Sequence, residues 1–534
     1  MKTKYFKLFT SVALLVIAMS CTDLDVDIKS RYTKFPDSEV AAEAKASNAY
    51  FAMRGPLGRD YNHAQSITSD ETMSYSFNGT DYYDNGVYSQ LILHNWNSDN
   101  SAISYWGSLT QGITICNNLI AELGGDEATV TAPIRAVRAY YLWVLMDSYG
   151  DVPLLNRVLQ EDEAIDRSPR AEIARFIESE LLAVKDLLPT NVDVSTYGKP
   201  TRWMANALLA KLYLNWAVYT CNDVATYTPA MSNSKLNDLV SACDEIIASG
   251  IFDLSDGYIS KFLPENGPHI KDFIYAMPYD RETQQGMTYA RFWTHRNGTV
   301  DFYGVTLPNS VGGIFTINSK FVDKFNLEGD ERNEIILGGP VFMRSPSTYK
   351  ATNAPWIVSG QQIVLKKEIT LNLFDETVQV DNTAHGGRSQ GYRSLKFYMD
   401  LKTTATQMRN QSNDVPIFRY ADVLLMKAEA ILRGASATNG DTPMSLMNRI
   451  RDYVKAPRIT QEPTLDELLD ERAREFFDEN WRRNDLIRYG MFEDDWAFKH
   501  VINPKTKTEL YRRIFPIPRS ILNTNTNWKQ NPGY

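Results

Sequence analysis

Apolar side chains recur at helical spacing over two long parts of the chain. In residues 201–219, for example, Ala205, Leu208, Leu212 and Trp216 follow one another at intervals of three or four, which places them on one face of a helix. Pro or a capping residue opens several such segments, and Gly closes most of them. The pattern predicts helices over 38–53, 103–123, 133–149, 169–188, 201–219, 236–249, 416–432 and 464–489.

The pattern changes between residues 252 and 402. Gly, Pro, Asn and Thr are frequent there, and short alternating runs occur at 362–365 and 377–380, which predicts loops and small β-hairpins. The apolar content of this part is thin for a core of its own, which argues against a separate domain. We therefore predict a helical block over 37–251, a loop-rich insertion over 252–402 that is the candidate ligand face, and a second helical block over 403–534 on the same body.

Small residues stand where paired helices would cross. Ala207 and Ala210 lie in one predicted helix, and Ala428 and Ala430 lie in another. Although the strict tetratricopeptide consensus is absent, such pairs favour stacked helical hairpins of that type. The predicted fold class is mostly α: a tetratricopeptide-like superhelix of helical hairpins with a loop-rich insertion that contains short β-hairpins.

The N-terminus has the pattern of an export signal. Lys2, Lys4 and Lys7 precede an apolar run at 8–19, which is shorter than the roughly 20 residues that span a bilayer. Small residues precede Cys21, as in a bacterial lipobox. We predict a signal peptide over 1–20, lipidation of Cys21 and an acidic tether over 21–36. The alternative is an ordinary cleaved signal followed by an unrelated cysteine.

Charge and cysteine content narrow the function classes. The net charge of −9 argues against nucleic acid, which selects basic surfaces. No later stretch is apolar enough to cross a membrane, so we expect membrane attachment through the lipid anchor only.

The remaining cysteines, Cys116, Cys221 and Cys243, are odd in number and make a poor disulfide framework. Small buried thiols are the simpler interpretation, and a Cys221–Cys243 link stays open.

The common catalytic and metal-binding motifs are absent. There is no His-Glu-x-x-His, Cys-x-x-Cys, phosphate-binding Gly loop or Gly-x-Ser-x-Gly, and the histidines show no ligand spacing. The densest acidic cluster, at 470–479, is interleaved with arginines on one helix, which favours a solvated, ion-paired face over a glycosidase pair. We predict no catalytic residue, no metal site and no cofactor; a structural calcium in the loops stays open, although no EF-hand spacing predicts one.

Aromatic residues in polar surroundings are the better functional signal. Sugars present C–H faces that pack on aromatic rings, and their hydroxyl groups need polar partners. Three segments combine both residue types, around positions 69–97, 289–297 and 353–356. The candidate ligand-binding residues are Asp70, Tyr82, Tyr83, Trp96, Asn97, Tyr289, Arg291, Trp293 and Trp356. The alternative for each single ring is a packed loop anchor.

Several motifs together resemble one known family. They are Cys-Thr-Asp-Leu-Asp at 21–25, Tyr-Gly-Asp-x-Pro-Leu at 149–154, Gly-Lys-Pro-Thr at 198–201, Phe-Arg-Tyr-Ala-Asp at 418–422, Asn-Arg-Ile-Arg at 448–451, the Glu-Arg and Glu-Phe pairs at 471–476, the run at 483–490, Ile-Pro at 517–518 and Gln-Asn-Pro-Gly-Tyr at 530–534. These motifs span nearly the whole chain and are similar to those of the SusD/RagB family of outer-membrane nutrient-binding lipoproteins.

The resemblance implies a fold, a partner and a location. Members of this family are helical, tetratricopeptide-like proteins on the cell surface, held at the outer membrane by a lipid anchor. They cover a SusC-like TonB-dependent transporter and pass glycans, or in some cases peptides, inward; they are not enzymes. It also implies a scaffold role for the matched residues Asp151, Arg419, Asp422, Glu429 and Arg472, at helix ends and in ion pairs between helices.

Three functions remain after these steps. The first is a glycan-binding import lipoprotein, with peptide uptake of the RagB type as its alternative. The second is a surface glycoside hydrolase, and the third is a scaffold that contacts only proteins. The ligand loops of the family vary, so no binding residue follows from the motifs, and the candidate residues rest on the aromatic and polar pattern alone.

Overall fold

A computed structural model describes residues 39–74, 86–161, 163–369, 383–496 and 499–534. The helices are α2 (Glu39–Tyr50), α3 (Arg54–Leu57), α4 (Asp60–Ile67), α5 (Val87–Ile92), α6 (Trp106–Glu122), α7 (Ala132–Tyr149), α8 (Arg170–Val184), α9 (Arg202–Leu214), α10 (Trp216–Thr220), α11 (Leu236–Ala248), α12 (Tyr289–Trp293), α13 (Ser319–Val322), α14 (Tyr420–Leu432), α15 (Pro443–Tyr453), α16 (Leu465–Phe476), α17 (Arg482–Tyr489), α18 (Lys499–Ile502) and α19 (Arg519–Thr524).

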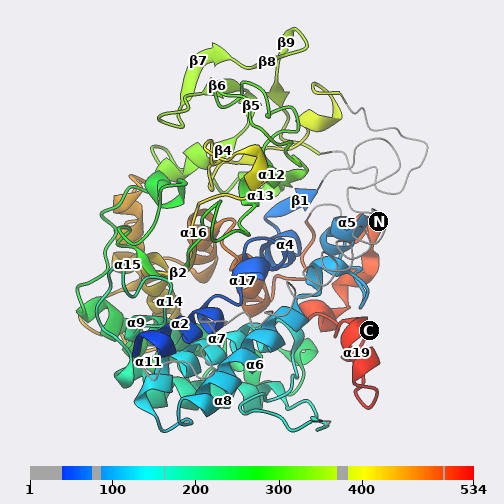
Figure 1. Ribbon diagram of the computed structural model, residues 1–534. Coiled ribbons are helices and arrows are strands. Elements are labelled where there is room, and N and C mark those ends of the chain that lie inside the picture. The colour runs from blue at the N-terminus through cyan, green and yellow to red at the C-terminus, as the bar shows by residue number, and fades with distance from the viewer. Residues whose placement is uncertain (1–38, 75–85, 162, 370–382, 497–498) are drawn as a thin grey trace, which may run out of the picture. The chain divides into compact units, whose positions relative to one another are not determined.

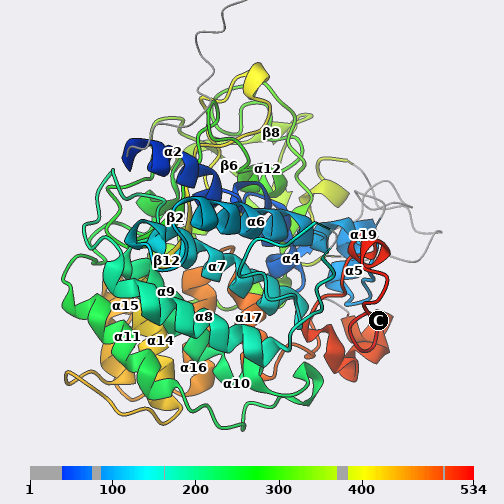
Figure 2. The ribbon, with the colours of Figure 1, turned by 60° about the horizontal axis from the view of Figure 1, so that its bottom comes forward.

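The helices stack as the pattern predicts. Neighbours along the chain pack on one another, α6 on α7, α7 on α8 and α9 on α11, and α11 then packs on α14 of the second helical block. Figure 2 shows these helices side by side. The residues from Ala46 to Tyr534 form one compact unit. The fold is therefore mostly α, with stacked helical hairpins.

Strands are short and pair two by two. They are β1 (Thr72–Ser74), β2 (Phe273–Met277), β3 (Phe315–Ile317), β4 (Ile336–Leu337), β5 (Gly339–Pro340), β6 (Phe342–Arg344), β7 (Ala351–Pro355), β8 (Ile357–Val358), β9 (Gln361–Gln362), β10 (Val364–Leu365), β11 (Arg393–Ser394) and β12 (Val415–Arg419). All these pairs are antiparallel, and β5 to β10 gather at one end of the unit (Figure 1). The run at 362–365 contributes to β9 and β10, whereas the run at 377–380 lies outside the described residues.

The predicted helix over 201–219 is divided into α9 and α10, and the predicted helices over 416–432 and 464–489 also have different bounds. Residues 415–419 form β12, which pairs with β2, so α14 begins only at Tyr420. The predicted helix over 464–489 is divided into α16 and α17, and Asp478 and Asn480 between them take left-handed backbone angles with φ of 61° and 71°. Asp and Asn adopt this conformation more readily than most residues. The helix has already ended at Phe476, since Phe477 lies outside the helical region with ψ of 131°.

The insertion has a hydrophobic cluster of its own. Trp356 lies at 2 % exposure within it, with Phe302, Val341 and Leu365. The expectation of too little apolar content for a core is wrong, since residues scattered through loops gather around one tryptophan. The cluster still belongs to the unit that holds both helical blocks.

The acidic cluster at 470–479 was predicted to form an ion-paired helix face that is exposed to solvent. The cluster is ion-paired, but its central carboxylates are buried, so the predicted exposure to solvent is wrong. Glu471 and Glu475 of α16 are fully enclosed, and both bind Arg332. Arg472 joins Asp422 of α14 at 2.7 Å. The roles that the resemblance implies are confirmed: Arg419 and Glu429 also form buried pairs, and the Asp151 carboxylate accepts a hydrogen bond from the first backbone N–H of α8.

Candidate ligand-binding site

Asp70 lies in an ion pair between two parts of the unit. Its carboxylate binds the Arg482 guanidinium through two contacts, at 2.7 and 2.8 Å, and the Asp70 side chain is 16 % exposed. The pair lines a pocket together with Lys320, Asp470 and Trp496. Asp70 therefore joins α17 to the segment before β1, and its oxygens are already occupied by a cation.

Trp96 and Asn97 are adjacent in sequence but differ in exposure. Trp96 is buried, and its indole N–H donates to the Tyr534 hydroxyl at 2.8 Å. Asn97 is exposed, and its side-chain oxygen accepts a hydrogen bond from the backbone N–H of Asp99 at 2.9 Å. Tyr82 and Tyr83 lie outside the described residues.

The predicted aromatic residues of the insertion are also buried. The Tyr289 hydroxyl donates to the Leu57 carbonyl at 2.6 Å, and the Trp293 indole donates to Asp478 at 2.9 Å. The Trp356 indole donates to the Val300 carbonyl at 3.2 Å. Together with Trp96, these rings are at most 2 % exposed. They offer no open face for a sugar, so the packed-anchor alternative describes each of them.

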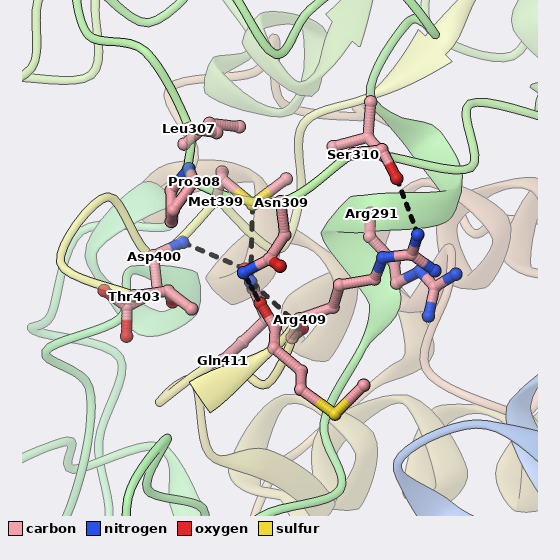
Figure 3. Close-up of a pocket in the computed structure, with 12 residues that line it drawn as sticks. Arg291, Leu307, Pro308, Asn309, Ser310, Met399, Asp400, Thr403, Arg409 and Gln411 are labelled. Atoms are coloured by element: carbon pink, nitrogen blue, oxygen red, sulfur yellow. Dashed lines mark hydrogen bonds between the residues drawn. The ribbon is translucent and has the colours of Figure 1, made fainter. Parts of the chain in front are cut away.

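Arg291, like Asp70, lines a pocket. It lies on α12, where its neighbours Ala290 and Phe292 are buried and Arg291 is half-buried. The backbone carbonyl of Arg291 accepts hydrogen bonds from the N–H groups of Gly312 and Gly313, at 2.9 and 3.1 Å. These bonds hold the loop at 307–313 against α12. Figure 3 shows the pocket between α12, this loop and the segment 399–411.

A second loop completes the pocket rim. Thr404 and Gln407 form a capping box, and Met408 follows with φ of 58° and 67 % exposure. The Asn309 amide donates to the carbonyls of Thr404 and Met408, which ties the two loops together. Non-glycine residues in left-handed conformations cost free energy and persist where the surroundings hold them. The loop therefore presents Met408 and Arg409 in a fixed conformation.

Arg409 projects from this loop toward Ser310. Its guanidinium donates to the Ser310 hydroxyl at 2.6 Å. The inner wall is apolar, with Leu307, Val311 and Met399. An apolar wall with a few polar groups at the rim is the usual make-up of a small-molecule site, but this cavity measures only about 20 Å³, so a ligand would contact its rim rather than fill it. We take this pocket, which we call the Arg291–Arg409 pocket, as the candidate ligand-binding site.

Comparisons with known proteins agree on one family. The SusD family matches residues 271–534, and a second family, described as starch-binding and associating with the outer membrane, matches residues 24–214. The starch-binding protein SusD of Bacteroides thetaiotaomicron is 26 % identical over the full length of both chains. The chain belongs to the SusD-like family.

Solved structures of SusD-like proteins share the fold. A SusD superfamily protein from Parabacteroides distasonis is 21 % identical, with a TM-score of 0.68 over 93 % of this chain and 99 % of that one. A surface glycan-binding protein from Bacteroides thetaiotaomicron, solved with laminarihexaose, is 19 % identical, with a TM-score of 0.66 over 92 % of this chain and 98 % of that one.

Three further features of this SusD-like chain concern metal ligands, cysteines and long apolar helices. Within the described ranges, no three His, Cys, Asp or Glu side chains are arranged to hold a metal ion. Cys116, Cys221 and Cys243 are all free thiols, which closes the question of a Cys221–Cys243 link. Across the same part of the chain, no helix has the length and apolar character needed to cross a membrane.

Sequence reasoning missed Asn309, Met408 and Arg409. Their loops lack aromatic residues, which were the signal for a sugar site. The sequence alone shows the capping pair Thr404 and Gln407. The loop that contains this pair, however, is nearly a hundred residues away along the chain from the loop at 307–311. Their meeting depends on tertiary packing that local sequence patterns do not show.

Proposed function

We propose that this SusD-like chain is a cell-surface lipoprotein that captures oligo- or polysaccharides and delivers them to a SusC-like TonB-dependent transporter in the outer membrane. The observation that carries the proposal is the full-length match to a starch-binding protein. A second relative of the same fold is named as a glycan-binding protein and was solved with laminarihexaose. The family that matches the N-terminal part is described as associating with the outer membrane, which supports the location.

The Arg291–Arg409 pocket supports binding of a sugar. Its rim carries Asn309, Ser310 and two guanidinium groups, which supply hydrogen bonds for hydroxyl groups. Pro308 and Met408 are exposed beside them and supply apolar surface for a C–H face. Lipidation of Cys21 would keep this site at the membrane, and the acidic tether at 21–36 would link it to the lipid.

Binding rather than hydrolysis is the proposed activity. The relatives are named as binding proteins. A glycosidase needs two carboxyl groups about 5 to 10 Å apart across an open sugar site. The densest acidic cluster instead holds Glu471 and Glu475 in buried pairs with arginine, so these carboxylates have no contact with a ligand.

The test is a titration of the purified chain, residues 22–534, against a panel of polysaccharides and peptides by isothermal titration calorimetry. We expect saturable binding to at least one glycan, with no release of reducing ends during prolonged incubation. Binding to peptides without binding to any glycan would replace the proposal by peptide uptake. Release of reducing ends would replace it by hydrolysis.

A further inference from the structure

A second cavity lies in the helical body, where α14 ends. Its volume is about 400 Å³, which is within the range of small-molecule sites. It is bounded by the ends of α9 and α10, by the loop at 229–235 and by the turn at 433–435 that follows α14. Figure 2 shows α9, α11 and α14 side by side in this part of the body. The cavity, which we call the Arg433 pocket, shares no lining residue with the Arg291–Arg409 pocket.

The lining of the Arg433 pocket is polar and carries positive charge. Its charged side chains are Arg433 and Arg488, and among the described residues no Asp or Glu lines it, although the net charge of the whole chain is −9. The other polar side chains of the lining are Tyr227, Ser232, Asn233, Ser234 and Asn237. A lining of this kind favours a ligand that has a negative charge and several hydrogen-bonding groups.

Both arginines belong to a buried network that, within the described ranges, has one more cation than carboxylates. Its members, joined by ion pairs of 2.5 to 2.8 Å, are the cations Lys211, Arg433, Arg472 and Arg488 and the carboxylates Asp422, Glu429 and Asp485. Burial lowers the pKa of Lys211 to about 8, so this cation is still protonated at pH 7. The Arg433 side chain is 13 % exposed, whereas those of the other three cations are at most 2 % exposed. The unbalanced positive charge is therefore accessible at Arg433.

Arg433 has donors that no protein acceptor uses. Its Nε donates to the Glu429 carboxylate at 2.8 Å, and in the described part of the chain this is the one hydrogen bond of the guanidinium. Nη2 is enclosed without a hydrogen-bond partner. A guanidinium has five N–H donors, and a charged donor that is left unpaired costs free energy. An oxyanion bound beside Nη1 and Nη2 would remove that cost.

The position of Arg433 is fixed before a ligand arrives. Arg488 holds the Glu429 carboxylate through two contacts, at 2.7 and 2.8 Å, and the Arg433 guanidinium carbon lies 4.8 Å from the centre of the Tyr489 ring. The polar loop of the lining is fixed as well, because the Asn233 amide donates to a backbone carbonyl at the end of α9 at 2.8 Å. A ligand therefore binds here without a cost for rearranging the site.

We propose that the Arg433 pocket binds a small acidic ligand of about monosaccharide size, through a carboxylate or a phosphate that accepts from the Arg433 guanidinium. Both groups present two oxygens to the two terminal nitrogens of a guanidinium. The hydroxyl groups of Ser232 and Ser234, which have no hydrogen bond elsewhere in the described chain, bind the hydroxyl groups of the ligand. This site is separate from the proposed glycan site and does not depend on glycan capture.

The experiment is a calorimetric titration of the purified chain, residues 22–534, with four probes. Glucuronate supplies a carboxylate, glucose 6-phosphate supplies a phosphate, glucose is the neutral counterpart of both, and inorganic sulfate is a bare ion. We expect one of the two sugar acids to bind with a Kd of about 1 mM or below. Glucose should bind at least about tenfold more weakly, since hydrogen bonds to charged groups are the stronger kind. The acid that binds more tightly identifies the oxyanion.

Variants test the assigned arginine. Arg433→Gln should weaken binding of the sugar acid about tenfold or more. Arg433→Lys should retain part of the affinity, because it keeps the charge without the planar fork. Arg135→Gln is the matched control: Arg135 is 12 % exposed and shares Glu180 with the buried Arg138, as Arg433 shares Glu429 with Arg488, but it lies outside the pocket lining. The control should leave the affinity unchanged, and thermal unfolding checks the fold of every variant.

The outcomes decide on this site alone. Failure of both sugar acids to bind the parent chain at tenfold the expected Kd would overturn the inference. Equal binding of glucose and the acids, or equal losses in Arg433→Gln and Arg135→Gln, would overturn it as well. Inorganic sulfate that binds as tightly as the sugar acids would overturn the assigned ligand class. Glycan capture is tested separately with polysaccharides, so its failure leaves this inference standing.

Discussion

At the scale of single residues, the most unusual feature is the charge buried in the helical body. Arg419 is 1 % exposed and binds Asp272 at 2.6 Å, Glu475 at 2.8 Å and Glu479 at 2.7 Å. Taking charges out of water is costly, and the mutual attraction of the groups offsets that cost only when all of them are paired. Removal of one partner should therefore be much more harmful here than at the surface.

The first prediction concerns this arginine. Arg419→Ala leaves three buried carboxylates without their shared cation, so we expect it to lower the free energy of unfolding by about 3–5 kcal/mol. Arg458→Ala is the control, because Arg458 is 66 % exposed and pairs with Asp452 at 3.6 Å, where about 0–1 kcal/mol is expected. Urea unfolding measures both. Similar losses for the two variants would contradict the account of the buried cluster.

The second prediction concerns Asp478, which accepts hydrogen bonds from Asn62 and Trp293. Burial raises the pKa of Asp478 to about 7, so the folded chain keeps a proton that the unfolded chain loses near pH 4. The folded state therefore binds more protons between about pH 4 and pH 7, and this group makes stability fall as pH rises through that window.

Asp478→Asn removes the titration, so the decrease in stability from pH 5 to pH 7.5 should be smaller in the variant than in the parent chain. Urea unfolding at the two pH values gives both slopes. Asp193→Asn is the matched control, because hydrogen bonds lower the pKa of this exposed carboxyl to about 2 and its charge is constant over the range. A slope unchanged by Asp478→Asn would show that another group titrates.

At the scale of elements, the sequence predicted the helices well and their interruptions poorly. The helices over 133–149 and 236–249 are confirmed within one or two residues, because their periodic faces and end signals are local. The strand β12 was missed, since its apolar residues fit a helix equally well and only pairing with β2, more than a hundred residues earlier, decides between them. The division between α16 and α17 likewise depends on Asp478, which is held by Asn62 and Trp293.

One local signal gives a prediction of its own. Thr464 caps α16: its hydroxyl accepts from the Glu467 backbone N–H at 3.2 Å, and the Glu467 carboxylate accepts from the Thr464 backbone N–H at 2.7 Å. Thr464→Ala should lower the free energy of unfolding by about 1 kcal/mol. Thr306→Ala, at an exposed threonine outside any helix, should change it by less than about 0.5 kcal/mol. A loss at Thr464 no greater than this control would mean that α16 is stabilised by packing alone.

At the scale of the whole molecule, the candidate site was only partly predictable. The aromatic and polar pattern found Arg291, but the tryptophans chosen with it serve the core. Trp96 binds Tyr534 at the other end of the chain, and Trp293 binds Asp478 at the division between α16 and α17. Whether a ring is exposed is decided by such distant partners, which local composition does not reveal. A charge does not decide it either, since the predicted residue Asp70 is held in an ion pair with Arg482.

The last prediction concerns attachment of the whole molecule to the membrane. Attachment is proposed to depend on acylation of Cys21, which follows the predicted signal peptide. Each buried CH₂ contributes about 0.8 kcal/mol, and a multiply acylated cysteine holds a protein stably. Cys21→Ser should abolish labelling by a fatty-acid probe and move the chain out of the membrane fraction, while the purified variant keeps its glycan affinity. Retention in the membrane fraction without label would show a different anchor.

Loss of the anchor should also slow glycan uptake by cells, because a tethered binding protein stays near its transporter at a high effective concentration and a released one does not.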